Sequence, residues 1–514
     1  MTRSTLNKVV FPGAFVIFCL WALWGAFPLV SYEANSMDIA AGCDATEDWA
    51  SLGERGYGYW MQPLTFILIY FFKWIFPALS SETIYSALTA LCCPAFWFLT
   101  IKLVSEISRV RPIYVLAALC LMPESYALAT YPNSEVFGLA AVAGAMLCAM
   151  RHRSLWCGAL LCLGVLLRLD VALLYPLLPI LFVMGGYTVC RAWILTAWCA
   201  AAVLLTVGPL YWLIGASVSE TFAVYDWYVP YVSGMTRALA IFGAYGPVSL
   251  PLCIGGLVLL WRRGPRLAFL YVLAGILLVH LSEVRFGNTP KHFAPILLVV
   301  PAAGAVALSW LRHRCRRPAA IACMAVIIVS QTVGLMPPRR LSSRLAYEDD
   351  RSWAITPGIA GLYRSNDEFV PIGGYVAYPF VLHEIKAETA RRLETLRYVR
   401  ASYPDAWLTS PTHEGDIRLL EQGYARRFRL CPDDKMWVVE RREKPGADRV
   451  APQGPEDVQL DHYADLLRQA AAIRGAILIP QTEPIYLHHD WILSQLERRG
   501  VIRQVAPHIY LLNP

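Results

Sequence analysis

The sequence has few charged residues for its length, and it lacks the motifs of common soluble nucleotide and metal enzymes. Only 16% of its 514 residues are charged, whereas a soluble domain has about 25%. It contains no Walker A loop, no Gly-rich dinucleotide fingerprint, and no CxxC, HExxH or Cys/His ladder. These absences argue against a nucleotide-driven pump, a transferase with a soluble-nucleotide donor, and a structural zinc site.

Hydrophobic residues are correspondingly frequent. Hydrophobic residues make up 57% of the chain and the mean hydropathy is +0.45, which indicates a multi-span membrane protein. The run from Val9 to Leu29 is long enough to cross a bilayer, and no small-residue cleavage site follows it, so we expect a retained span. Further apolar runs bring the expected number of spans to eleven: 84–104, 113–131, 134–150, 155–167, 171–189, 192–215, 238–261, 267–282, 293–311 and 318–336.

The segment 63–79, PLTFILIYFFKWIFPAL, is either another span or a helix at the membrane surface. Pro63 and Pro77 at its ends and Lys73 within it favour the surface helix. With that choice and a cytoplasmic N-terminus, the Lys/Arg bias agrees with the topology. The basic residues then on the cytoplasmic side are Arg3, Lys8, Arg109, Arg111, Arg151, Arg153, Arg191, Arg262, Arg263, Arg266, Arg312, Arg314, Arg316 and Arg317.

The chain divides into two domains at about Met336. Residues 1–336 form the expected all-α membrane domain, and residues 337–514 are polar enough to form a soluble domain on the outer face. In this second domain short apolar runs alternate with helical stretches, in two groups separated by a Pro- and Gly-rich linker at 442–457. We therefore predict an extracytoplasmic α/β domain.

The first outer loop, residues 32–83, is unusually acidic for a membrane protein. Its first half reads NSMDIAAGCDATEDWASLGERGYGYWMQPL. A solvated acidic surface explains any single carboxylate of this loop. Taken together, the carboxylates of this first half lie between the first span and the aromatic surface helix, where polar groups are costly unless they face a cavity or a partner.

A first span, an acidic outer loop, a "PL" start to an amphipathic stretch and further spans resemble the GT-C type of integral-membrane glycosyltransferases. That superfamily includes the protein O-mannosyltransferases, the lipid A aminoarabinose transferase and the oligosaccharyltransferases. The resemblance covers roughly residues 9–311 and is strongest in 9–104. It implies a polyprenyl-phosphate- or diphosphate-linked sugar donor, a lipid, glycan or protein acceptor, membrane lipids as surroundings, a bacterial inner membrane, and no nucleic-acid partner.

By this resemblance, a first-loop carboxylate is the general base that takes the proton of an acceptor hydroxyl. The candidates are Glu47 and Asp48 in TEDW, with Asp38 in NSMD behind them. Several members of the superfamily carry an Asp-Glu pair at the start of this loop, where this chain has YEANSMD instead. The choice among the three therefore stays open. Several carboxylates in one loop also suit a divalent metal, Mg²⁺ or Mn²⁺.

Four basic residues are candidates for binding the donor phosphate: Arg168, Arg285, Lys291 and His292. The superfamily commonly has a basic residue before a late, Pro-containing helix, and SEVRFGNTPKHFAPILLVVP matches that description at 282–301. The alternative for the last three is simple snorkelling to the membrane interface. The alternative for Arg168 is a structural ion pair with Asp170.

Other outer-face residues are candidates for the cavity or the acceptor: Glu135, Asp170, Tyr225, Asp226 and Trp227. Asn133 or Ser134, just before Glu135, alternatively caps a helix. Aromatic residues around Asp226 are also typical membrane anchors. Cys43 and Cys431 lie outside the expected spans and are either paired or free thiols.

The rival function is a transporter or flippase of a lipid-linked glycan. Transporters usually show repeated groups of spans and charges at the bilayer midplane. This sequence shows no such repeat, and its polar residues gather at one face. The sequence therefore favours an enzyme.

Overall fold

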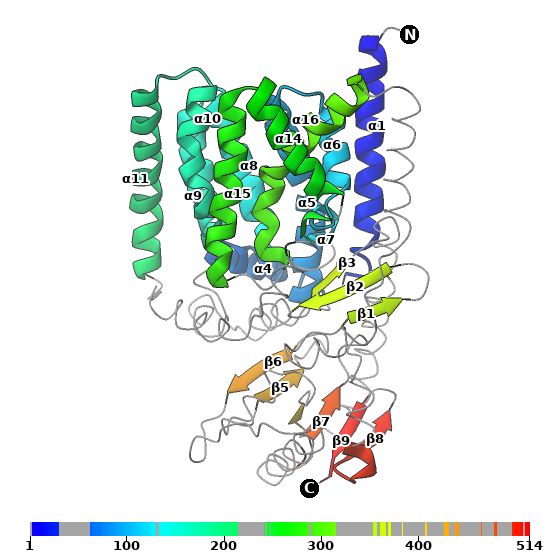
Figure 1. Ribbon diagram of the computed structural model, residues 1–514. Helices are drawn as coiled ribbons and strands as arrows, with labels where there is room; N and C mark the ends of the chain where they lie inside the picture. The colour runs from blue at the N-terminus through cyan, green and yellow to red at the C-terminus, as the bar shows by residue number, and fades with distance from the viewer. Residues whose placement is uncertain are drawn as a thin grey trace.

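The structure is a computed structural model in which a helical bundle precedes two β-sheets (Figure 1). The residues that it describes are 3–29, 62–129, 133–213, 241, 244–246, 248–286, 290–314, 353–356, 360–365, 368–371, 383, 407–408, 426–430, 437–441, 464, 477–480, 496–506 and 509–513.

Helices account for the regular structure of the described residues before 315. The α-helices of the bundle are α1 (Arg3–Trp24), α4 (Pro63–Ile75), α5 (Ser81–Ser108), α6 (Pro112–Cys120), α7 (Glu124–Ala127), α8 (Ser134–Met150), α9 (Ser154–Leu167), α10 (Leu178–Met184), α11 (Val189–Leu213), α14 (Ser249–Arg263), α15 (Arg266–Phe286) and α16 (Val300–Arg314). Two 3₁₀ helices, η2 (Leu169–Leu177) and η4 (Pro290–Leu298), precede α10 and α16.

Several expected spans are confirmed as helices, and others are broken. The helix α8 has the predicted bounds 134–150, whereas the predicted runs 113–131, 171–189 and 293–311 are each divided into two shorter helical pieces. Proline lies within both 3₁₀ helices, at Pro176 and Pro295, and its missing N–H disfavours a continuous α-helix.

Among the described residues, two helical stretches are long and apolar enough to cross a membrane, Thr83–Ser108 and Val189–Leu210. The other apolar helices are shorter, between 10 and 17 residues. The expected total of eleven spans includes 318–336, which lies outside the described residues, so that number remains a prediction.

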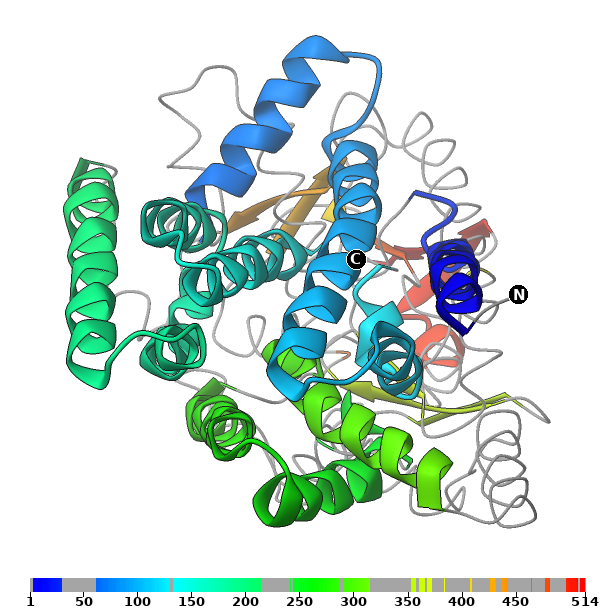
Figure 2. The ribbon, with the colours of Figure 1, turned by 90° about the horizontal axis from the view of Figure 1, so that it is seen from above.

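The helix α4 lies across one end of the bundle and not along it. In Figure 1 α4 crosses the end of the bundle, and in Figure 2, which looks along the bundle, it is seen from its side. One face of α4 buries Phe66 and Ile69 against Tyr85 of α5 and Phe137 of α8. This is the orientation expected for the surface helix predicted at 63–79. We call this end of the bundle the α4 end.

The opposite end carries many basic residues, and we call it the basic end. Here α5, α8, α10, α14 and α16 finish and α6, α9, α11 and α15 begin (Figure 1). The described basic residues in or beside these helix ends are Arg109, Arg111, Arg151, Arg153, Arg191, Arg262, Arg266, Arg312 and Arg314. The gathering of these clusters at one end agrees with the arrangement predicted from the Lys/Arg bias.

The described strands of the C-terminal region form two sheets. The strands β1 (Trp353–Thr356), β2 (Ala360–Ser365) and β3 (Glu368–Pro371) make an antiparallel sheet. The second sheet has the order β6-β5-β4-β7-β9-β8, and its strands are β4 (Trp407–Leu408), β5 (Arg426–Leu430), β6 (Trp437–Arg441), β7 (Ile477–Pro480), β8 (Ile502–Ala506) and β9 (Ile509–Leu512).

The strands of the second sheet form two groups, with β4, β5 and β6 before the predicted linker 442–457 and β7, β8 and β9 after it. Within each group neighbouring strands are antiparallel, and the groups meet through the parallel pair β4 and β7. Most residues between the strands lie outside the described residues. The α/β class of a separate domain 337–514 therefore remains a prediction.

The C-terminal region meets the bundle at the α4 end. His383 Nδ1 is 2.8 Å from the carbonyl oxygen of Phe27, and its ring centroid is 4.9 Å from that of Trp24, in the last turn of α1. In Figure 1 both sheets lie beyond this same end. The α4 end thus brings together α4, the end of α1 and the C-terminal region.

Candidate functional site

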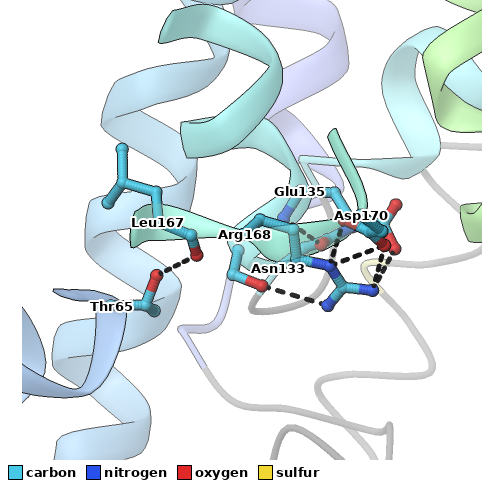
Figure 3. Close-up of polar contacts among 7 residues, drawn as sticks. Thr65, Asn133, Glu135, Leu167, Arg168 and Asp170 are labelled. Carbon is cyan, nitrogen blue, oxygen red and sulfur yellow. Dashed lines mark hydrogen bonds and ion pairs between the residues drawn. The ribbon is translucent and has the colours of Figure 1, made fainter. Parts of the chain in front are cut away.

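A cluster of charged side chains lies inside the α4 end, centred on Arg168 (Figure 3). Arg168 follows the last residue of α9 and has an extended backbone, with φ −162° and ψ 118°. Its N–H still donates to the carbonyl oxygen of Gly164, at 2.8 Å. This single extended residue separates α9 from η2, and Figure 3 shows its side chain directed to Glu135 and Asp170.

The Arg168 guanidinium binds two carboxylates and a hydroxyl. Its Nη2 is 3.0 Å from Glu135 Oε1 and 2.9 Å from Asp170 Oδ2, and its Nε donates to both Asp170 oxygens at 3.0 Å. Its Nη1 donates to Ser134 Oγ at 3.2 Å. One guanidinium therefore joins the start of α8 to the start of η2.

Burial differs sharply within this cluster, which we call the Arg168 cluster. The side chain of Glu135 is 4% exposed and that of Arg168 is 11% exposed, but that of Asp170 is 40% exposed. With all three groups ionised the cluster carries a net charge of −1. Because Arg168 already compensates two carboxylates, its net attraction for an added phosphate is weaker than that of an isolated cation.

The start of α8 fixes the position of Glu135. Asn133 is the residue before this helix, and its Oδ1 accepts a hydrogen bond of 2.8 Å from the Glu135 N–H. The Asn133 N–H in turn donates to Thr89 Oγ1 of α5 at 3.0 Å. The capping role considered for Asn133 is confirmed, and the same cap holds Glu135 facing Arg168.

The helix α4 is tied to the same point of the bundle. Thr65 Oγ1 donates to the carbonyl oxygen of Leu167 at 2.9 Å, in the residue before Arg168 (Figure 3). Two glycines permit the close approach of α8 and α9 here: a Cβ on Gly138 would lie 2.9 Å from the Arg168 Cβ, and one on Gly164 would lie 3.3 Å from Val142 Cγ2. The surface helix and the charged cluster are therefore parts of one packed unit.

Of the predicted site residues, the structure brings together Arg168, Glu135 and Asp170. The ion pair considered for Arg168 and Asp170 is confirmed. The role of Arg168 in binding phosphate remains a prediction.

The other predicted basic residues lie on α15 and η4. Arg285 lies in the last turn of α15, and Lys291 and His292 lie in the first residues of η4, where the structure describes the backbone alone. The helix α15 packs against η4 and also against η2, the segment that follows Arg168.

The remaining predicted site residues lie outside the described residues: Asp38, Glu47, Asp48, Tyr225, Asp226 and Trp227. Cys43 and Cys431 also lie outside them. Among the residues that are described, no group of three or more His, Cys, Asp or Glu side chains is placed to hold a metal ion. The proposed Mg²⁺ or Mn²⁺ concerns the first loop and stays a prediction.

Sequence reasoning missed a contact between a histidine and a tyrosine within the bundle. His280 Nε2 of α15 lies 2.9 Å from the Tyr245 hydroxyl, and the two rings stack at a centroid distance of 5.8 Å. The His280 ring is also 5.4 Å from that of Phe293 in η4. A histidine within an otherwise apolar run was the available signal. The contacts link α15 to η4 beside the segment of Lys291 and His292.

Among known proteins, similarity to this chain is found in solved structures. No protein-family profile matches the chain, and no curated protein matches it. Two crystal structures of ArnT from Cupriavidus metallidurans are similar to it. The one bound to undecaprenyl phosphate is 14% identical, with 77% of this chain and 72% of that chain covered and a TM-score of 0.48.

The second structure, ArnT in the apo state, is 16% identical, with 68% of this chain and 69% of that chain covered and a TM-score of 0.46. ArnT is the lipid A aminoarabinose transferase, one of the GT-C enzymes that the sequence resembles.

Proposed function

We propose that this chain is a membrane glycosyltransferase that moves a sugar from a polyprenyl-phosphate- or diphosphate-linked donor to an acceptor at the α4 end of the bundle. That end is the outer face of a bacterial inner membrane in this proposal. The observation that carries it is the Arg168 cluster. Charged side chains within a membrane bundle are costly, and where they occur they usually mark a functional site.

The surroundings of the cluster suit a lipid-linked donor. The donor's polyprenyl tail stays in the bilayer, while its sugar must meet an acceptor in water. The α4 end offers both conditions, because it has an apolar surface helix, a partly exposed carboxylate at Asp170, and the C-terminal sheets beyond it. A site buried at the bilayer midplane, as in many transporters, would lack this access.

The first outer loop supplies the base in this proposal. Its acidic part follows α1 beyond Phe27, which contacts His383, and ends before Gln62, the residue directly before α4. Both attachment points of this acidic part therefore belong to the α4 end. Asp38, Glu47 or Asp48 takes the proton from the acceptor hydroxyl as the sugar is transferred.

The leaving group needs cations. The lipid phosphate departs as an anion, and positive charge placed at that position lowers the barrier. In this proposal Arg285, Lys291 and His292 supply the charge from α15 and η4. Arg168 holds Asp170 and Glu135 in place, and contact of Arg168 with the phosphate is the alternative that the sequence also supports.

The test is sugar transfer by the purified full-length protein in detergent, measured as release of polyprenyl phosphate from mono- and diphosphate-linked donors. We expect release by the wild type and a fall of about 10²- to 10⁴-fold for the variant that removes the base. The variants are Glu47→Gln, Asp48→Asn and Asp38→Asn, and the matched controls are Asp44→Asn and Glu54→Gln in the same loop. Wild-type protein that binds donors but releases nothing from any of them would overturn the proposal in favour of a transporter.

Two additions sharpen this assay. Release that stops in EDTA and returns with Mg²⁺ or Mn²⁺ would assign a metal to the first-loop carboxylates. Deletion of residues 340–514 tests whether the C-terminal region binds the acceptor or covers the site, as its location at the α4 end suggests. Full transfer by that shortened chain would contradict such a role.

A further inference from the structure

At the basic end, two loops lie against each other at one corner of the bundle. The first joins α8 to α9 and contains Arg151, His152 and Arg153, and the second joins α10 to α11 and contains Tyr187. The His152 and Tyr187 rings lie 4.5 Å apart between centroids. We call this region the α9–α11 corner.

The backbone of both loops is adapted to this contact. His152 has φ +59° and Gly186 has φ +99°, which is the left-handed region that favours glycine. At Gly185 a Cβ would lie 2.7 Å from the carbonyl oxygen of Met150, so a side chain there would force the loops apart. The two loops are therefore packed at a fixed distance.

The corner presents cations to solvent. Arg151, Arg153 and Arg191 are exposed, and Arg151 is paired with Glu106 of α5. The side chains of these four residues give a net charge of +2. Two helices end at the corner and two begin there, so their dipoles oppose one another and the positive charge comes from the side chains.

The Arg191 guanidinium has a defined position. Its central carbon lies over the Tyr187 ring, 5.1 Å from the ring centroid, and the His152 ring contacts the same tyrosine. A guanidinium that rests over an aromatic ring can still donate its N–H groups to the oxygens of a phosphate.

Directly after these cations, the starts of α9 and α11 are apolar and exposed. Trp156 of α9 is 62% exposed and Trp193 of α11 is 60% exposed, and Leu155, Val189 and Ile194 are exposed beside them. Most of the apolar stretch of α11, Val189–Leu210, is not buried in the bundle, and its exposed surface continues through Trp198 to Leu204 and Leu205. The surface below the cations is thus apolar along the length of a helix.

We propose that the α9–α11 corner binds an anionic phospholipid. Arg153 and Arg191 bind the phosphate of the headgroup, and the acyl chains lie along the surface of Trp156, Trp193 and the exposed face of α11. The charge of the corner matches an anionic headgroup, and the continuous apolar surface below it matches acyl chains and not a soluble anion. This lipid site is at the opposite end of the bundle from the proposed transferase site and does not depend on it.

The test compares lipids that share the same acyl chains. The full-length protein in a neutral detergent receives phosphatidylglycerol or phosphatidylcholine, and bound lipid is counted by native mass spectrometry while thermal stability is followed in parallel. We expect preferential binding of phosphatidylglycerol by the wild type. The double variant Arg153→Gln/Arg191→Gln should bind it about tenfold to thirtyfold more weakly, the effect of two cations near an anionic headgroup.

The matched control is Arg312→Gln/Arg314→Gln, which removes two exposed cations from the same end of the bundle at the end of α16. It should retain the wild-type affinity. An equal loss of affinity for phosphatidylglycerol in the control would show that the lipid responds to the general surface charge of this end, and it would overturn the proposed site. Equal binding of phosphatidylcholine, or equal protection by glycerol phosphate, would also overturn it. The variant Arg153→Lys/Arg191→Lys should show an intermediate affinity. It keeps the positive charge but loses the planar guanidinium, which can bind a phosphate with two hydrogen bonds at once.

Discussion

The helix α8 has an Arg–Glu ion pair at each of its ends, and the two pairs differ in burial. At its start Glu135 meets Arg168, with side chains 4% and 11% exposed. At its end Arg151 meets Glu106, with side chains 52% and 34% exposed. The chemistry of the two pairs is the same, so any difference between their effects reports the surroundings.

The surroundings set the cost of separating each pair. A buried charge whose partner is removed keeps its desolvation penalty, and the loss is typically several kcal/mol. An exposed charge is rehydrated instead, and the loss is small. The Arg168 pair also has further partners, Ser134 and Asp170, whereas the Arg151 pair faces water at the basic end. The first pair is therefore part of the buried Arg168 cluster, and the second joins two helix ends at the surface.

The largest effect is expected for Arg168→Gln. This change leaves the Glu135 carboxylate buried without its cation, and we expect a loss of about 3–5 kcal/mol in the free energy of unfolding. The measurement is thermal unfolding in detergent with a thiol-reactive dye, since Cys93, Cys157 and Cys199 are buried in the folded chain.

The control for this variant is a second substitution. Arg168→Met/Glu135→Leu removes both charges of the pair, and we expect it to recover most of the loss because neither member is left as an unpaired buried ion. A double variant as unstable as Arg168→Gln alone would show that the ion pair is not the source of the effect.

The next effect tests the close approach of the helices beside the buried pair. In Gly138→Ala the new Cβ would meet the Arg168 Cβ and Val171 Cγ1, each at 2.9 Å, and we expect a loss of about 1–3 kcal/mol. The matched control is Gly158→Ala in α9, where nothing lies within 4 Å of the new Cβ. The free energy of unfolding of that control should be unchanged or rise by up to about 1 kcal/mol, because alanine has a higher helix propensity than glycine. Equal thermal shifts for both variants would contradict the tight packing.

A smaller change in stability is expected for Asp170→Asn. Asp170 is 40% exposed, so losing its charge should cost about 1 kcal/mol. Sugar transfer should fall by more than this loss of stability explains, because Asp170 is the carboxylate of the cluster that is most open to solvent. The measurement is transfer rate beside thermal unfolding, with Glu106→Gln as the control at the basic end. Unchanged transfer would remove Asp170 from the proposed site.

The smallest effect is expected for Arg151→Gln. Its pair with Glu106 is exposed, and we expect a loss of about 0–1 kcal/mol. Salt distinguishes it from the buried pair: at about 1 M salt, where screening acts within a few ångströms, the effect of Arg151→Gln should disappear and that of Arg168→Gln should persist. Two variants with the same salt dependence would mean that burial does not separate the pairs.

The sequence predicted the elements of the bundle better than its contacts. The bounds of α8 and the surface orientation of α4 follow from long apolar runs, prolines and a lysine. The pair of Arg168 with Asp170 was foreseeable because the two residues are close in the sequence. The contact of Arg168 with Glu135 was not, because 33 residues and a complete helical hairpin separate them.

The sequence failed to reveal the contacts of three polar residues for one common reason. Thr65, Thr89 and His280 each lie within an apolar helix, where a sequence shows a polar side chain but not its partner. In the structure each one bonds a different element, since a buried polar group requires a partner and finds it across the bundle. Such pairs depend on how the helices are arranged, which the order of residues alone does not reveal.

The sequence by itself determined which segments are apolar enough to enter a membrane, where the basic residues gather, and where the chain becomes polar, because these are properties of local composition. Only the tertiary structure decided that Glu135 joins the Arg168–Asp170 pair beside α4, and that Tyr187 contacts both His152 and Arg191. The physical reason is that burial and pairing of charges depend on distances between elements. Those distances are set by close packing of helices at residues such as Gly138 and Gly185.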